Sequence, residues 1–172
     1  MERRQRRAVA DRHDGCPRQP LAQHAVERGL RGLVQGGGRL VVELSPDEAA
    51  ALFDQMIALL REPHEYQTLV IDSVTALDEI FTAEALEKDG KAKTLASALG
   101  GYGAGVQYVA NQHHRVRKAA QLLNERRGMT VVFLAHADIE TMRLPDQDDY
   151  QRWSLRLPQK SLPVYVDYCD VV

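Results

Sequence analysis

The sequence predicts an α/β fold in which helices flank a parallel sheet. Two stretches, 68–72 and 130–135, are continuously apolar and rich in β-branched residues, as buried parallel strands are. The chain between them has a largely helical pattern, and a helical crossover specifies parallel strands with a right-handed connection. We therefore expect both strands in one sheet, with their carboxyl ends at the same edge.

Length and composition are those of one globular domain. A chain of 172 residues is long enough for one core, and it contains no apolar run near the ~20 residues that a membrane span needs. Its two cysteines form no metal-like spacing. We expect no membrane partner and a reducing, cytoplasmic setting.

Residues 1–39 differ from the rest of the chain. They hold nine Arg, no Lys and four acids, for a net charge of +5, whereas the remainder has a net charge of −7. Within them, only 21–34 has the composition of a short helix. We divide the chain into a disordered or non-native basic lead, 1–39, and a domain, 40–172. A nucleic-acid-binding arm, a flexible segment and a shifted reading frame are alternative explanations of the lead.

The elements of the domain are predicted in order from capping signals and apolar spacing. Ser45, Pro46 and Glu48 form a helix start that follows a strand at 39–44. The other predicted elements are helices at 45–61 and 74–88, a short helix at 91–99, a glycine-rich break at 100–105, a helix at 106–127, a polar loop at 138–149, a half-buried strand at 150–157 and a short helix at 161–168.

Two polar residues end the two apolar strands. Asp72 follows 68–71 abruptly, at the edge where open α/β sheets bind ligands, and a carboxylate there can hold Mg²⁺ beside nucleotide phosphates. The alternative is an ordinary strand followed by a helix cap. His136 follows 130–135, so adjacent strands would bring both side chains to one rim. This convergence favours a nucleotide site.

Five segments, taken together, resemble the phage-type RecA-like nucleotide-binding proteins, a branch of the P-loop ATPases associated with phage DNA recombination. The likeness covers about residues 45–172. It implies a RecA-like core that is incomplete at both ends, ATP and Mg²⁺ as ligands, single-stranded DNA as a partner, ring or filament assembly, and a function in recombination or annealing. The matching segments are 64–73, 101–105, 125–137, 157–160 and 169–172.

The resemblance also implies roles for single residues. Asp72 would be the Walker B acid, which holds Mg²⁺ through water. Ser73 would share that hydration shell, or cap the next helix. His136 would sense the γ-phosphate or the attacking water, or only cap its strand. Lys160 would reach the phosphates of a neighbouring subunit, or be a solvated surface lysine.

One family motif is missing. The phosphate-binding Gly-x-x-x-x-Gly-Lys-Ser/Thr does not occur in residues 1–67, and Gly36 to Arg39 lacks its Lys-Ser/Thr ending. Glu43 is a weak candidate for the catalytic acid of an earlier strand. The alternative function is therefore a non-hydrolysing remnant or scaffold that keeps the fold, and hydrolysis by this chain is left open.

Other groups of residues give weaker indications of function. His113 and His114 point about 100° apart on a helix, so they cannot easily share a metal ion. The cations at 115–118 and 126–127 could contact DNA phosphates or form a solvated helix face. Tyr102, between glycines, could stack on a base or act as a packed hinge residue.

Overall fold

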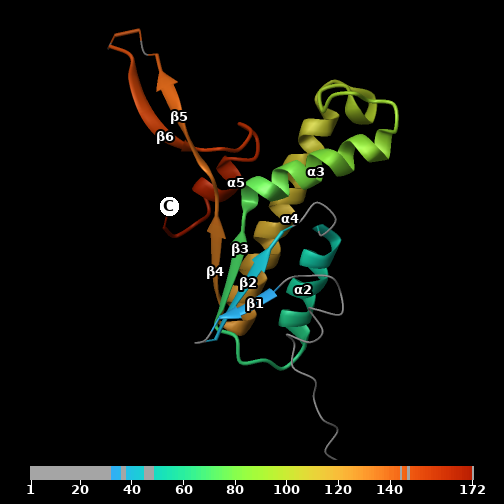
Figure 1. Ribbon diagram of the computed structural model, residues 1–172, viewed down its shortest axis with the longest axis vertical. Coiled ribbons are helices and arrows are strands. Elements are labelled where there is room, and N and C mark those ends of the chain that lie inside the picture. Colours follow the sequence, from blue (N-terminus) through green and yellow to red (C-terminus); the bar gives the residue numbers. More distant parts are fainter. Residues whose placement is uncertain (1–31, 36–37, 45–48, 144, 147, 172) are drawn as a thin grey trace, which may run out of the picture.

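The computed structural model describes residues 32–35, 38–44, 49–143, 145–146 and 148–171 (Figure 1). Its main sheet has four strands in the order β1-β2-β3-β4. β1 runs antiparallel to β2, whereas β2, β3 and β4 are parallel. The strands are β1 (Gly32–Gln35), β2 (Arg39–Glu43), β3 (Thr68–Asp72) and β4 (Thr130–Leu134).

The helices connect these strands, and a separate hairpin follows β4. The helices are α2 (Ala49–Arg61), α3 (Val74–Asp89), the 3₁₀ helix η1 (Ala98–Gly100), α4 (Ala104–Arg127) and α5 (Pro163–Val166). The hairpin pairs β5 (Ala137–Met142) with β6 (Tyr150–Leu155). None of the helices described has both the length and the apolar character needed to cross a bilayer.

The predicted α/β class with a parallel sheet is confirmed. α2 joins β2 to β3, and α3, η1 and α4 join β3 to β4, so each parallel pair has a helical crossover. In Figure 1, α4 runs behind the strands. The strand residues that pack into the core are Leu40, Val42, Leu69, Ile71, Val131 and Phe133, which form two rows across one face of the sheet.

The expectation that β4 is buried on both faces is wrong. Val132 and Leu134 are 37% and 41% exposed, and Val70, which pairs with Val132, does not belong to the core cluster. Two crossovers of the same hand step across the sheet in one direction, which places their helices on the same face. Among the described residues, the opposite face therefore has no helix layer.

The polar loop expected at 138–149 is also wrong, because its first half is strand β5. Figure 1 shows the β5–β6 hairpin projecting beyond the end of β4, away from the main sheet. Trp153 is 73% exposed and its cross-strand partner Ile139 is 52% exposed. The strand predicted at 150–157 is present as β6, but it is not half-buried, because its first four residues are exposed.

Other element predictions have mixed outcomes. The predicted strands at 39–44 and 68–72 and the helices at 74–88 and 106–127 are present within two residues of their expected bounds. The short helix at 91–99 is wrong, since that segment forms turns that lead into η1. The helix start at 45–48 lies outside the described residues. So does most of the helix considered at 21–34, whose last residues belong to β1.

Candidate functional site

The strand order brings Asp72 and His136 to the same edge of the sheet. Asp72 is the last residue of β3 and pairs in register with Leu134, the last residue of β4. His136 follows two residues later. On the other side of β3, Asp72 pairs with Glu43, the last residue of β2. The carboxyl ends of three parallel strands thus form one rim, where open α/β sheets bind ligands.

Asp72 and Ser73 make the turn from the rim into α3. The Asp72 side chain is exposed, and its backbone carbonyl accepts a hydrogen bond from Leu44 N at 3.2 Å. The peptide bond between Asp72 and Ser73 is cis. Ser73 is buried, and its Oγ accepts from Ala76 N at 3.2 Å. Ser73 therefore has the helix-capping role that the sequence offered as one alternative.

His136 is held through its backbone and through its ring. Its backbone N–H donates to Thr75 Oγ1 at 3.0 Å, which attaches it to the first turn of α3. Its Nδ1 lies 2.8 Å from Nη2 of Arg156, the residue just after β6. These contacts connect the rim with α3 on one side and with the root of the hairpin on the other.

Lys160 is not joined to this rim by any contact of the described residues. It is exposed in the segment between β6 and α5, and its Nζ donates to Gln107 Oε1 in the first turn of α4 at 3.5 Å. A weak contact of this kind is compatible with either role suggested for Lys160, the solvated lysine or the cation offered to another subunit.

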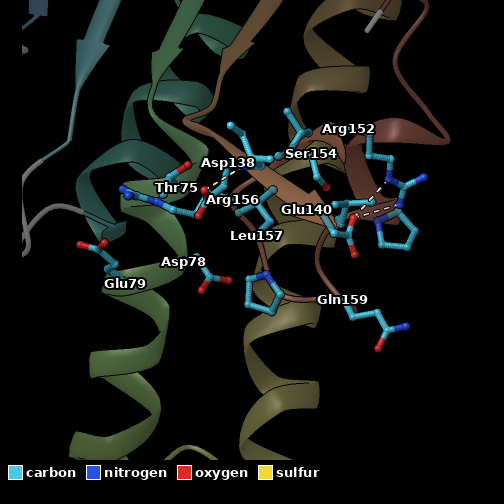
Figure 2. A pocket seen from close by; sticks show the side chains of 15 residues that line it. Thr75, Asp78, Glu79, Asp138, Glu140, Arg152, Ser154, Arg156, Leu157 and Gln159 are labelled. Atoms are coloured by element: carbon cyan, nitrogen blue, oxygen red, sulfur yellow. Dashed lines mark hydrogen bonds and ion pairs between the residues drawn. The ribbon is translucent and has the colours of Figure 1, made fainter. Parts of the chain in front are cut away.

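A cavity of about 940 Å³ adjoins the rim, between the start of α3 and the hairpin (Figure 2). Neither Asp72 nor His136 lines it, but both partners of His136 do, namely Thr75 and Arg156. In Figure 2, Arg152 of β6 reaches Glu140 of β5, and the closest contact of this ion pair is 3.0 Å. The hairpin forms one wall of the cavity, the start of α3 forms another, and residues within 157–163 complete its lining.

A buried hydrogen-bond network adjoins this cavity through Asp78. His113 of α4 is fully buried, with its Nδ1 2.8 Å from Tyr165 Oη and its Nε2 3.1 Å from Asp78 Oδ1. Burial, and then the negative charge of Asp78, raise the pKa of Tyr165 well above its ordinary value, so the phenol stays protonated. Because the Asp78 carboxylate can only accept, Nε2–H donates to it, and in the neutral ring Nδ1 then accepts from the phenol. Asp78 also accepts from Ser161 Oγ at 3.4 Å and lines the cavity.

Sequence reasoning missed this network. It considered His113 only as a metal ligand, and no cluster of three or more metal-ligating side chains occurs in the part of the chain that the structure describes. A signal was available, because His113 lies four residues after Val109 and three before Val116, on the same helix face. Arg115 and Arg117, two of the cations considered as phosphate contacts, stack on the rings of Phe53 and Tyr168.

The rim is better suited to bind the Mg²⁺ ion of a nucleotide complex than to bind the phosphates directly. An exposed carboxylate such as that of Asp72 is an oxygen ligand of the kind that Mg²⁺ prefers. Gly36 and Gly37 lie outside the described residues, and Gly38 directly precedes the beginning of β2, whereas the rim is formed by the end of β2. Gly38 O accepts from Thr68 N at the opposite end of β3.

The comparisons with known proteins agree with this architecture. Residues 26–172 match the family model described as AAA domain. The chain belongs to this AAA domain family. Its three parallel strands and helical crossovers are consistent with the P-loop NTPase-like core of the AAA domain, which indicates nucleotide binding with Mg²⁺ in general. No curated protein and no solved structure matches this AAA domain.

Proposed function

We propose that this chain is a RecA-like ATP-binding protein of phage type that acts on single-stranded DNA in recombination or annealing. The observation that carries the nucleotide part is the common rim of Glu43, Asp72 and His136 at the ends of three parallel strands. The AAA domain match supports the same class of ligand. The phage origin and the DNA partner come from the sequence resemblance.

In this proposal each rim residue has a separate task. Asp72 holds Mg²⁺ through water and thereby orients the phosphate oxygens. His136 donates a hydrogen bond to the terminal phosphate or to a water molecule. Glu43, whose position in β2 is next to Asp72, is the candidate for orienting a water nucleophile. Lys160 is proposed to serve a neighbouring subunit in a ring or filament.

A non-hydrolysing scaffold is the second candidate, and the missing phosphate loop favours it. A P-loop makes several backbone and lysine hydrogen bonds to the phosphates, and bonds to charged groups are each worth roughly 1.5–3 kcal/mol. A chain without these hydrogen bonds would bind ATP weakly, through the bound Mg²⁺ ion alone. Such a protein would keep the fold and bind a partner without turnover.

Substitution of Asp72 by alanine tests the nucleotide proposal. We expect the wild type to bind ATP in a Mg²⁺-dependent way and Asp72→Ala to lose about tenfold of that affinity, equivalent to about 1.4 kcal/mol. Isothermal titration with and without Mg²⁺ measures both values, and phosphate release measured alongside separates ATPase from scaffold.

Asp54→Ala provides the control, because Asp54 is an exposed aspartate on α2 outside the rim. It should bind ATP as the wild type does. Equal affinities for wild type and Asp72→Ala would contradict the role of Asp72. No Mg²⁺-dependent binding by the wild type would contradict the nucleotide proposal itself.

The DNA part of the proposal concerns the segment between α3 and α4. Tyr102 there is fully exposed, and Lys91 and Lys93 of the same segment are exposed as well. The hairpin is a poorer phosphate-binding surface, since residues 137–155 carry five acids and two arginines. An exposed aromatic ring in a segment that also carries exposed cations suits the stacking of an unpaired base.

Replacement of Tyr102 by alanine is expected to weaken single-stranded DNA binding by about 1 kcal/mol, the low end of the range for one stacked base. Fluorescence anisotropy with a labelled oligonucleotide measures this change, and the wild-type affinity should fall as salt rises. Tyr150→Ala, on the acidic hairpin, is the matched control. A wild-type affinity that does not depend on salt would contradict phosphate binding.

A further inference from the structure

Arg156 contacts His136 in two ways. Its backbone N–H donates to His136 O at 2.8 Å, which extends the β5–β6 pairing one step beyond Ala137 and Leu155. Its guanidinium Nη2 lies 2.8 Å from His136 Nδ1. A side chain at the root of the hairpin is therefore bonded to the ring that stands at the nucleotide rim.

The chemistry of the pair fixes the protonation of the ring. A guanidinium has only donors and is always charged in proteins, so at 2.8 Å it must donate and Nδ1 must accept. A neutral imidazole that accepts at Nδ1 carries its proton on Nε2. Nε2–H is then the one ring group of His136 that is able to donate to a phosphate oxygen.

The surroundings of Arg156 leave its guanidinium available to bond the His136 ring. Arg152, on β6, pairs with Glu140, whereas the salt bridges among the described residues include none to Arg156. Thr75 anchors the backbone of His136 from the side of α3. The ring is thus the part of His136 whose orientation Arg156 decides.

We infer that Arg156 is a positioning residue for His136: it holds the imidazole as the Nε2–H tautomer and ties that ring to the root of the β5–β6 hairpin. The inference rests on the proposed function only for the phosphate that Nε2–H would meet.

The tautomer can be measured without any nucleotide. Ring ¹⁵N spectra of histidine-labelled protein at about pH 8, where imidazoles are neutral, distinguish protonated from unprotonated nitrogens. The His136 signals are assigned by their loss in His136→Gln. We expect a single Nε2–H tautomer in the wild type and a mixture of tautomers in Arg156→Met, which keeps the length of the side chain without its donors.

Two further variants separate positioning from general structure. Arg156→Lys retains a donor and should restore the wild-type ring signals. Arg152→Met removes the arginine four residues earlier, on β6, and should leave them unchanged. Mg²⁺–ATP affinity should fall about two- to fivefold in Arg156→Met, as for an exposed charged contact, and should not change in Arg152→Met. Amide spectra of the main sheet verify that each variant is folded.

The outcomes distinguish this inference from the proposed function. Identical His136 ring signals in wild type and Arg156→Met would overturn the inference, and so would equal changes in Arg156→Met and Arg152→Met. A wild type that binds no nucleotide, but whose ring tautomer depends on Arg156, would contradict the proposed function and leave the positioning of the ring established.

Discussion

Replacement of His113 by alanine is expected to lower the free energy of unfolding by about 3–5 kcal/mol. The side chain is fully buried, and its ring packs edge-on against Phe81 with centroids 5.2 Å apart. Its loss leaves a cavity and removes the hydrogen bond that His113 makes to Tyr165 Oη and one of the two that Asp78 accepts. A buried polar group left without a partner costs more than a missing bond at the surface. Urea denaturation followed by circular dichroism measures the change.

Two variants of the same region make this result interpretable. His114 is adjacent on α4 but exposed, so His114→Ala should change stability by no more than about 0.5 kcal/mol. Tyr165→Phe removes one hydroxyl and keeps the ring, and should cost about 1–2 kcal/mol. Similar free energies of unfolding for His113→Ala and His114→Ala would show that the network does not stabilise the fold.

The sequence predicted the centre of the fold because local pattern and tertiary position agree there. One face of the β-branched runs of β3 and β4 packs against the core, and the crossover between them has clear helical spacing, closed by Gly90 and Gly128. Given a parallel pair, the common edge of Asp72 and His136 follows from geometry alone. That part of the candidate site required no knowledge of side-chain packing.

The sequence alone did not predict the parts of the fold and of the site that depend on contacts between distant residues. β5 is a strand because its backbone pairs with β6, and all its residues but Met142 are exposed, so burial in the core does not select it. The contact of Arg156 with His136 joins residues 20 apart that only the hairpin brings together. The exposed face of β4 depends on where the helices lie, which the composition of the strand does not record.

A Gly105→Ala substitution is expected to destabilise the protein by about 2 kcal/mol, although alanine is normally the better helix residue. Alanine in a helix gains about 1 kcal/mol over glycine. A Cβ at position 105 would lie 2.9 Å from the Cβ of Ala98 and closer still to the backbone oxygen of Leu95. Overpacking against backbone costs about 3 kcal/mol at the upper end of its usual range, so the clash outweighs the helix propensity.

The neighbours of Gly105 have little freedom to move. Leu95 O accepts from Ala98 N at 3.3 Å, and Leu99 N donates to Asp89 Oδ2 at 2.6 Å, so the turn before α4 is tied to the end of α3. Thermal unfolding of Gly105→Ala should therefore show a lower midpoint than Gly103→Ala. Gly103 has a φ of +81° but open space around its missing Cβ, so its substitution costs only backbone strain of about 1–2 kcal/mol.

The same contact bears on the proposed DNA surface, because it seats the segment that carries Tyr102 against α4. A Gly105→Ala protein that unfolds at the wild-type midpoint would mean that residues 91–103 can shift to admit a methyl group. Tyr102 would then not be held in a fixed position, and base stacking by it would have to bear the cost of ordering that segment. If Tyr102 is held rigidly for base stacking, the Gly105→Ala protein should have both a lower unfolding midpoint and weaker DNA binding than the wild type.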